Sequence, residues 1–236
     1  MLDQIEESKF AALRKNCHDL GVPSPPEVFI NMKVVESDGQ VSRDEKFRAH
    51  SWTRNFYNWM FMAAGDTGGD YQNHYIAGRM SARRTNGGID DINRAPNRSD
   101  VGSGYGFYSS STSNAYGIQV GTGVTAFDHN DSTLATLIEP GTGLCQLSYH
   151  AHTSLGVKSY ADTTWKSTLT RMLDNDSGAL ISVTETGLVW RGEMCRSSTG
   201  YYLMERNVFA SAVEVANGAR LTVNYEISMD FSTPDA

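Results

Sequence analysis

Residues 221–231 read LTVNYEISMDF, and apolar and polar side chains alternate through the whole stretch. The apolar positions are Leu221, Val223, Tyr225, Ile227, Met229 and Phe231. Successive side chains of a β-strand point to opposite faces, so this spacing of two predicts a strand with one buried face and one solvated face. The Asn217-Gly218 pair just before it is typical of a tight turn between antiparallel strands.

Shorter stretches with a similar pattern occur along much of the chain. They cover residues 28–34, 47–50, 116–120, 145–152, 165–173, 179–190, 201–206 and 213–215. Turn-forming residues separate them, as in the DNDSG run at 174–178. Short strands joined by such turns predict a mainly β fold, an antiparallel β-sandwich or jelly roll. Between two of these strands we expect Ser132 to cap one helical turn that runs through Ile138.

The N-terminal segment has a helical pattern instead. Apolar side chains recur there at Leu2, Ile5, Leu13, Cys17 and Leu20. The VPSPPE run at 22–27 ends the helix, because proline fixes the backbone and lacks an amide donor. We therefore expect residues 1–27 to form a helix on a stiff arm, and residues 28–236 to form the β-domain. Such a helix can pack on its own domain or on a neighbouring subunit.

A second, aromatic helix is expected after residue 50. Ser51 is a suitable N-cap, and the stripe that follows has the spacing of one helix face. Its members are Trp52, Phe56, Trp59, Met60 and Ala63. We interpret this helix as one that packs on the core.

Residues 64–115 contain no leucine, one valine and three isoleucines, and they are rich in Gly, Ser, Asn and Asp. This composition buries too little apolar area for a core, which predicts a long loop insertion. Its tyrosines and arginines are of types enriched at interfaces. We predict interface contacts at Leu2, Ile5, Leu13, Tyr71, Tyr75, Arg83, Arg84, Tyr105, Phe107 and Tyr108. A small-ligand site and a merely tolerated loop are the alternatives.

The overall composition restricts the classes of partner. The 236 residues include 39% hydrophobic and 20% charged residues, as in folded domains. A net charge of −7 argues against nucleic acid, whose phosphates select basic surfaces. No apolar run reaches the roughly 20 residues of a membrane helix, and the acidic start MLDQIEESKF is unlike a secretory signal. We expect neither nucleic acid nor a membrane as a partner, and folding in the cytosol.

The three cysteines, Cys17, Cys145 and Cys195, show no CxxC spacing. An odd number without that spacing favours ordinary thiols over a zinc site or a disulfide framework. An inter-subunit disulfide is the alternative.

The histidines offer the one candidate for metal chemistry. His150 and His152 lie two positions apart on the strand expected at 145–152, so both would project from its solvated face and could supply two ligands. The core-facing set would then be Cys145, Leu147, Tyr149 and Ala151. No acidic residue has a matching spacing, and no GxSxG nucleophile motif is present. We predict no catalytic residue, no cofactor and no metal site.

The order of several motifs resembles a β-sandwich module of structural proteins from tailed bacteriophages. The matching segments are GIQVGTG, DSTLATLIEPG, LCQLSYHAH, LTRMLDNDSGALISVTETGLV, YYLMERNVF and VEVANGARLTVNYEIS, between residues 117 and 228. The HSWTRNFYNWMF segment at 50–61 looks like the aromatic helix before that module. The resemblance spans about residues 28–228, and residues 64–115 match no particular subclass. It implies a component of the virion head, neck or tail, and it brings no catalytic residues.

The resemblance therefore implies a non-enzymatic structural subunit of a tailed-phage particle, made in the host cytoplasm and located in the virion. Its partners would be further copies of itself and other virion proteins. The alternative is a receptor- or carbohydrate-binding module of a phage tail or fibre that stacks exposed aromatic rings on a host surface glycan. A metal-dependent hydrolase built on His150 and His152 is the third class.

Overall fold

The computed structural model describes residues 4–22, 24–49, 51–65, 80–92, 106–153, 157–161, 163–195 and 198–231. Within these residues there are two helices, α1 (Gln4–Asp19) and α2 (Arg54–Gly65). The strands are β1 (Glu27–Val35), β2 (Val41–Ala49), β3 (Ser81–Arg83), β4 (Ile89–Asp91), β5 (Gly117–Gly121), β6 (Ser148–Tyr149), β7 (Val157–Ala161), β8 (Thr164–Asp174), β9 (Ile181–Cys195), β10 (Ser198–Val215) and β11 (Arg220–Asp230).

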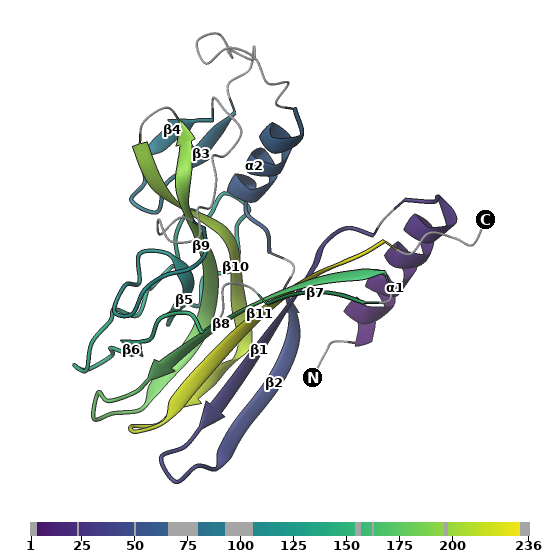
Figure 1. Cartoon of the computed structure of the whole chain (residues 1–236). Helices are drawn as coiled ribbons and strands as arrows, with labels where there is room; N and C mark the ends of the chain where they lie inside the picture. The colour runs from purple at the N-terminus through teal and green to yellow at the C-terminus, as the bar shows by residue number, and fades with distance from the viewer. Residues whose placement is uncertain are drawn as a thin grey trace.

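The strands form two facing sheets and one small hairpin. The larger sheet has the order β2-β1-β11-β8-β6, with β7 also paired to β8, and the second sheet has the order β10-β9-β5. Every strand pair is antiparallel. The prediction of a mainly β, antiparallel sandwich with an N-terminal helix is confirmed (Figure 1). The narrower jelly-roll description stays a prediction.

The main core lies between the two sheets and follows the alternation in the sequence. Leu221, Val223 and Tyr225 of β11 have no exposed surface, and neither do Ile118 of β5 and Leu188 of β9. Strand β1 alternates between buried and half-buried residues along its whole length. Burying a large aliphatic or aromatic side chain contributes about 1.5–3 kcal/mol, so this end of the sandwich supplies most of the stability.

The two sheets separate at their other end. Strands β9 and β10 continue past the core and carry α2 with the β3–β4 hairpin, whereas β7, β8 and β11 run towards α1 (Figure 1). A second apolar cluster forms around the extended part of β9 and β10, from Ala82, Ile92, Trp190, Tyr202 and Met204.

The tract at 64–115 contains regular structure that the sequence did not indicate. Strands β3 and β4 lie within it, and Ala82 packs fully buried against the second apolar cluster. The α2 side chain Asn55 holds this hairpin, because its amide nitrogen donates to the Arg83 carbonyl at 2.9 Å and its oxygen accepts from the Arg83 amide at 2.8 Å. These two hydrogen bonds and the burial of Ala82 together hold the hairpin.

Two local predictions are wrong, because backbone donors find tertiary partners. Helix α2 begins at Arg54 and not after a cap at Ser51, since Ser51 accepts from the Arg206 amide and the Thr53 amide donates to Met204, both on β10. Residues 132–138 form no helical turn. The amides of Ala135 and Thr136 there donate to the Glu185 carboxylate at 3.1 and 2.7 Å.

Candidate functional site

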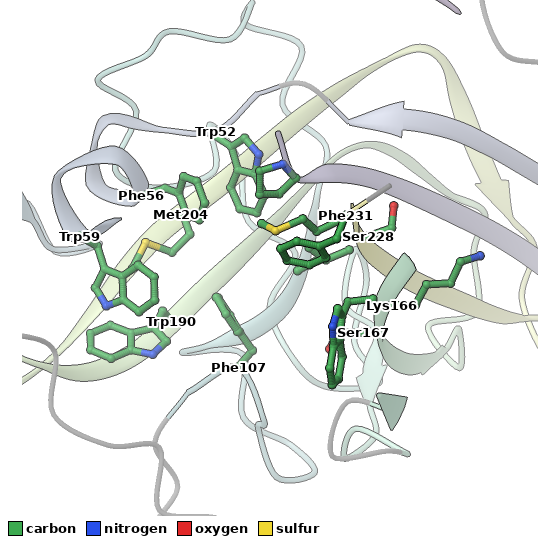
Figure 2. Close-up of a pocket in the computed structure, with 14 residues that line it drawn as sticks. Trp52, Phe56, Trp59, Phe107, Lys166, Ser167, Trp190, Met204, Ser228 and Phe231 are labelled. Atoms are coloured by element: carbon green, nitrogen blue, oxygen red, sulfur yellow. The ribbon is translucent and has the colours of Figure 1, made fainter. Parts of the chain in front are cut away.

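A groove of about 610 Å³ opens where the two sheets separate. Its lining comes from α2, the strands β8 to β11, and the segments around Pro26 and Phe107. Most of its lining side chains are aromatic or aliphatic (Figure 2). We call this cavity the aromatic groove.

One wall of the aromatic groove is a series of aromatic rings held by α2 and β9. Trp52 stacks on Phe56 with ring centroids 3.8 Å apart and planes 13° apart, and Trp59 lies 6.4 Å from Trp190. The Trp52 backbone bridges to Glu205 of β10, and the Thr53 hydroxyl donates to the Leu203 carbonyl at 2.6 Å. These polar contacts fix the start of α2 against β10.

The other wall is formed by the ends of β8 and β11. Trp165 is paired with Met229 across the two strands, and both line the groove. Trp165 is 48% exposed and Phe231, just after β11, is 40% exposed. The alternation that buries Leu221 in the core thus continues into side chains that no second sheet covers.

Polar groups in the aromatic groove are few and do not converge. Lys166, Ser167 and Ser228 contribute to its lining. Figure 2 shows the Lys166 ammonium directed away from the aromatic rings, and its nitrogen lies 3.5 Å from the Glu226 carboxylate. The described lining thus has no acid–base pair aimed at a common point, and the groove is suited to bind apolar surface.

The buried charged side chains Glu185 and Arg206 have structural partners. The Glu185 carboxylate accepts from the amides of Gly123, Ala135 and Thr136 and from the Arg206 guanidinium at 2.8 Å. Arg206 also contacts Asp131 at 2.7 Å. These partners occupy the carboxylate and fix the loop between β5 and residue 136.

The two histidines do not share a face, so the expectation of a common polar surface is wrong. His150 is partly exposed and its Nε2 lies 2.7 Å from Asp174. His152 is 3% exposed, and its Nε2 accepts from the Ile118 amide at 3.2 Å. Burial lowers the pKa of His152 to about 4, so the ring is neutral at pH 7. No group of three potential metal ligands occurs among the described residues.

Irregular pairing explains this difference from the expected strand at 145–152. Strand β6 covers only Ser148–Tyr149, and Cys145 is exposed with a φ of 60°. The fully buried Arg171 guanidinium donates to the carbonyls of His150 and Ile118, each at 2.9 Å. It also donates to the carbonyls of Ser110 and Ser113. A buried cation thus organises the loops on both sides of β5.

The residues predicted to make interface contacts, where the structure describes them, do not lie on one common surface. Phe107 lines the aromatic groove, Tyr108 is half-buried beside His152, and Leu13 is 40% exposed on α1. Arg83 is exposed on β3, whereas Arg84 forms an ion pair with Asp90. Residues outside the described set, or without a described side chain, are Leu2, Ile5, Tyr71, Tyr75 and Tyr105.

Sequence reasoning missed the groove residues Trp165, Trp190 and Phe231. All three lie at the ends of strands that the sequence predicts. A large aromatic side chain at a strand end was the signal that could have indicated an exposed apolar surface. The aromatic stripe with Phe56 and Trp59 packs on the second apolar cluster, as expected, and it also lines the groove.

Helix α1 contacts the sandwich through a polar anchor. The Glu7 carboxylate accepts from Arg48 of β2 at 2.7 and 2.8 Å, and Arg14 contacts Glu27 at 2.6 Å. The hydrogen bonds from Arg48 lower the pKa of Glu7. The Phe10 ring covers the same guanidinium, with its centroid 4.1 Å from the Arg48 Cζ.

Comparison with known proteins finds no match among family models, curated proteins or solved structures. In the described part of the chain, neither helix is long and apolar enough to cross a bilayer.

Proposed function

We propose that the chain is a non-enzymatic structural subunit of a tailed-phage particle, which works by associating with further copies of itself and with other virion proteins. The aromatic groove is the observation that carries this proposal. The groove is an apolar concavity of about 610 Å³ with few polar groups, and Trp165 and Phe231 in it are partly exposed. Covering this apolar surface with a protein partner lowers the free energy.

The use of the buried polar groups supports a structural role. Glu185, Arg206 and Arg171 are bonded to backbone groups or to one another, and His152 is held by backbone groups. A catalytic acid or nucleophile needs an open position next to its reacting atom. These side chains have their bonding positions filled by the protein, so they stabilise loops.

The positions of the resemblance motifs give further support. The GTG run lies at the end of β5, the DNDSG run forms the turn between β8 and β9, and the Asn217-Gly218 pair forms the turn before β11. Each motif therefore lies at a turn or strand end of the β-sandwich, which is the placement that the resemblance implies.

Gold-labelled antibodies against the purified chain test this proposal on intact particles of the phage whose genome encodes it. We expect gold at one recurring place on each particle, and we expect antibody preincubated with the purified chain to lose that labelling. Particles that carry neither gold nor peptides of this chain by mass spectrometry would overturn the proposal.

A glycan-binding role is favoured by one separate feature. Tyr160 and Trp165 are 57% and 48% exposed, and their ring centroids are 5.1 Å apart. Exposed aromatic rings of this kind can stack on sugars. Particles that assemble with Tyr160→Ala but no longer adsorb to host cells would support this role, whereas unchanged adsorption would argue against it.

A further inference from the structure

Helix α1 is almost entirely unburied in its own chain. None of its residues with a described side chain is buried, and Leu20, just past its end, is 76% exposed. A free helix of 16 residues is only marginally stable in water. The polar anchor at Arg48 contacts just one side of it, so the helix still lacks an apolar partner.

Phe10 packs on that anchor, whereas the leucines near the end of α1 lie away from it. With 100° per residue, Leu13 and Leu20 project about 120° around the helix from Glu7 and Arg14. Leu13 is 40% exposed and Val22 is 46% exposed. The outer side of α1 is thus an unpartnered aliphatic ridge, which we define by Leu13, Leu20 and Val22.

The same chain carries a concave surface of matching chemistry. The aromatic groove is apolar and open, with α2 and β9 on one side and the ends of β8 and β11 on the other. Helix binding in an apolar groove is a common way for proteins to recognise one another. No α1 residue with a described side chain lines the groove of its own chain, and the Arg48 anchor holds the helix elsewhere.

We propose that the aliphatic ridge of α1 from one copy occupies the aromatic groove of the next copy. This inference rests on the proposed function, because both require self-association. The two surfaces differ, so the contact is head-to-tail and closes into a ring when the rotation between copies allows it. Pro26 lines the groove and also lies at the end of the connector after α1. Each subunit therefore presents its helix and its groove at the same end of the molecule.

The size of the contact predicts how the assembly behaves. A helix of 16 residues is about 24 Å long and about 10 Å wide, so half of its surface is roughly 400 Å², which is the most that the groove and its rim can cover. The total of roughly 800 Å² per junction lies below the usual size of a stable two-body interface. We therefore expect open pairs to dissociate readily, and closed rings, in which every subunit makes two junctions, to persist.

Disulfide formation between two cysteine variants of the chain, mixed with each other, tests the contact. In a full-length background with Cys17, Cys145 and Cys195 replaced by Ser, one population carries Leu13→Cys and the other carries Ser228→Cys in the groove. Any mixed disulfide must be intermolecular. We expect a cross-linked dimer on a non-reducing gel after mild oxidation of the mixture.

The matched control replaces an exposed serine far from the groove. Ser37→Cys lies in the turn between β1 and β2 at the opposite end of the sandwich, and we expect it to give at least tenfold less dimer with Leu13→Cys. Equal dimer yields with Ser228→Cys and Ser37→Cys would overturn the helix-in-groove contact.

Sedimentation of two helix variants provides an independent check. Leu13→Glu places a charge on the aliphatic ridge, and Ala11→Glu places the same charge on another side of α1. We expect Leu13→Glu to weaken self-association about tenfold or more and Ala11→Glu to leave it unchanged, with equal circular dichroism. Equal association of both variants would refute this inference and leave the virion assignment intact. Particles without the chain would remove the virion assignment and leave the contact intact.

Discussion

The two ends of the sandwich are built by the same strands and differ in what covers them. At one end Leu221 and Tyr225 of β11 are fully buried against the opposite sheet. At the other end Met229 and Phe231 continue the same alternation and line an open groove. Alternation therefore determines which side chains share a face, and the course of the opposite sheet determines whether that face is buried. The closed end is where stability is expected, and the open end is where binding is expected.

The largest loss of stability is expected when the buried ion pair between Glu185 and Arg206 is broken. Glu185→Leu removes the carboxylate that pairs with Arg206 and leaves a guanidinium with 1% side-chain exposure without that partner. Breaking a buried pair in this way costs about 3–5 kcal/mol. Urea unfolding measures the change. Glu214→Leu, which removes an exposed carboxylate from β10, is the control and is expected to stay within about 0.5 kcal/mol of the parent.

A matched pair on β11 compares the two ends directly. Leu221→Ala should lower the free energy of unfolding by about 2–4 kcal/mol, because it leaves a cavity in the core. Met229→Ala should lower it by less than about 1 kcal/mol, because Met229 is only partly buried, and should instead weaken self-association. Chemical denaturation and sedimentation of both variants check this. Similar losses of stability would mean that the two ends are equally packed.

A pH-dependent effect is expected from Glu205, which lies between the sheets. Its Oε2 accepts from the Tyr225 hydroxyl at 2.8 Å, its Oε1 has no partner among the described residues, and burial raises its pKa from 4.5 to about 8. Between those values the unfolded chain ionises while the folded chain stays protonated. The free energy of unfolding should therefore fall as the pH rises from about 4.5 to 8, and then level off.

Glu205→Gln isolates that contribution. It keeps the shape and cannot ionise, so stability between pH 5 and 8 should decline less steeply than in the parent. Two charged or titratable side chains lie next to Glu205. Burial raises the pKa of Tyr225 well above 10, so Tyr225 does not titrate in this range. Arg206 donates to Glu185 instead. Parallel pH profiles for the two proteins would contradict the assignment.

The smallest effect concerns the polar anchor of α1. Glu7→Gln removes an ion pair that is partly exposed on the Glu7 side, so its effect on global stability should stay below about 1 kcal/mol. Release of the helix should nevertheless speed proteolysis within the connector at 20–26. Lys15→Gln, which removes an exposed pair within α1, is the control and should not change the cleavage rate.

The fold was largely predictable from residue patterns, whereas the candidate site was not. Strand β11 and the turn at Asn217-Gly218 have strong local signals, and the structure contains both. The start of α2 differs from the prediction because β10 bonds the Ser51 carbonyl and the Thr53 amide, which no local pattern records. His152 was misplaced because the buried Arg171 organises distant loops. The groove depends on where two sheets diverge, and that divergence is a property of the whole fold.

Hydrogen exchange at two protein concentrations tests the central claim most directly, since it reports on both ends in one experiment. We expect the amides of α1, and those of β8 and α2 beside the aromatic groove, to exchange more slowly at high concentration. The amides of Leu221 to Tyr225 in the closed end should exchange at the same rate at both concentrations. Exchange in α1 and around the groove that does not depend on concentration would contradict the claim that these two surfaces bind each other between copies.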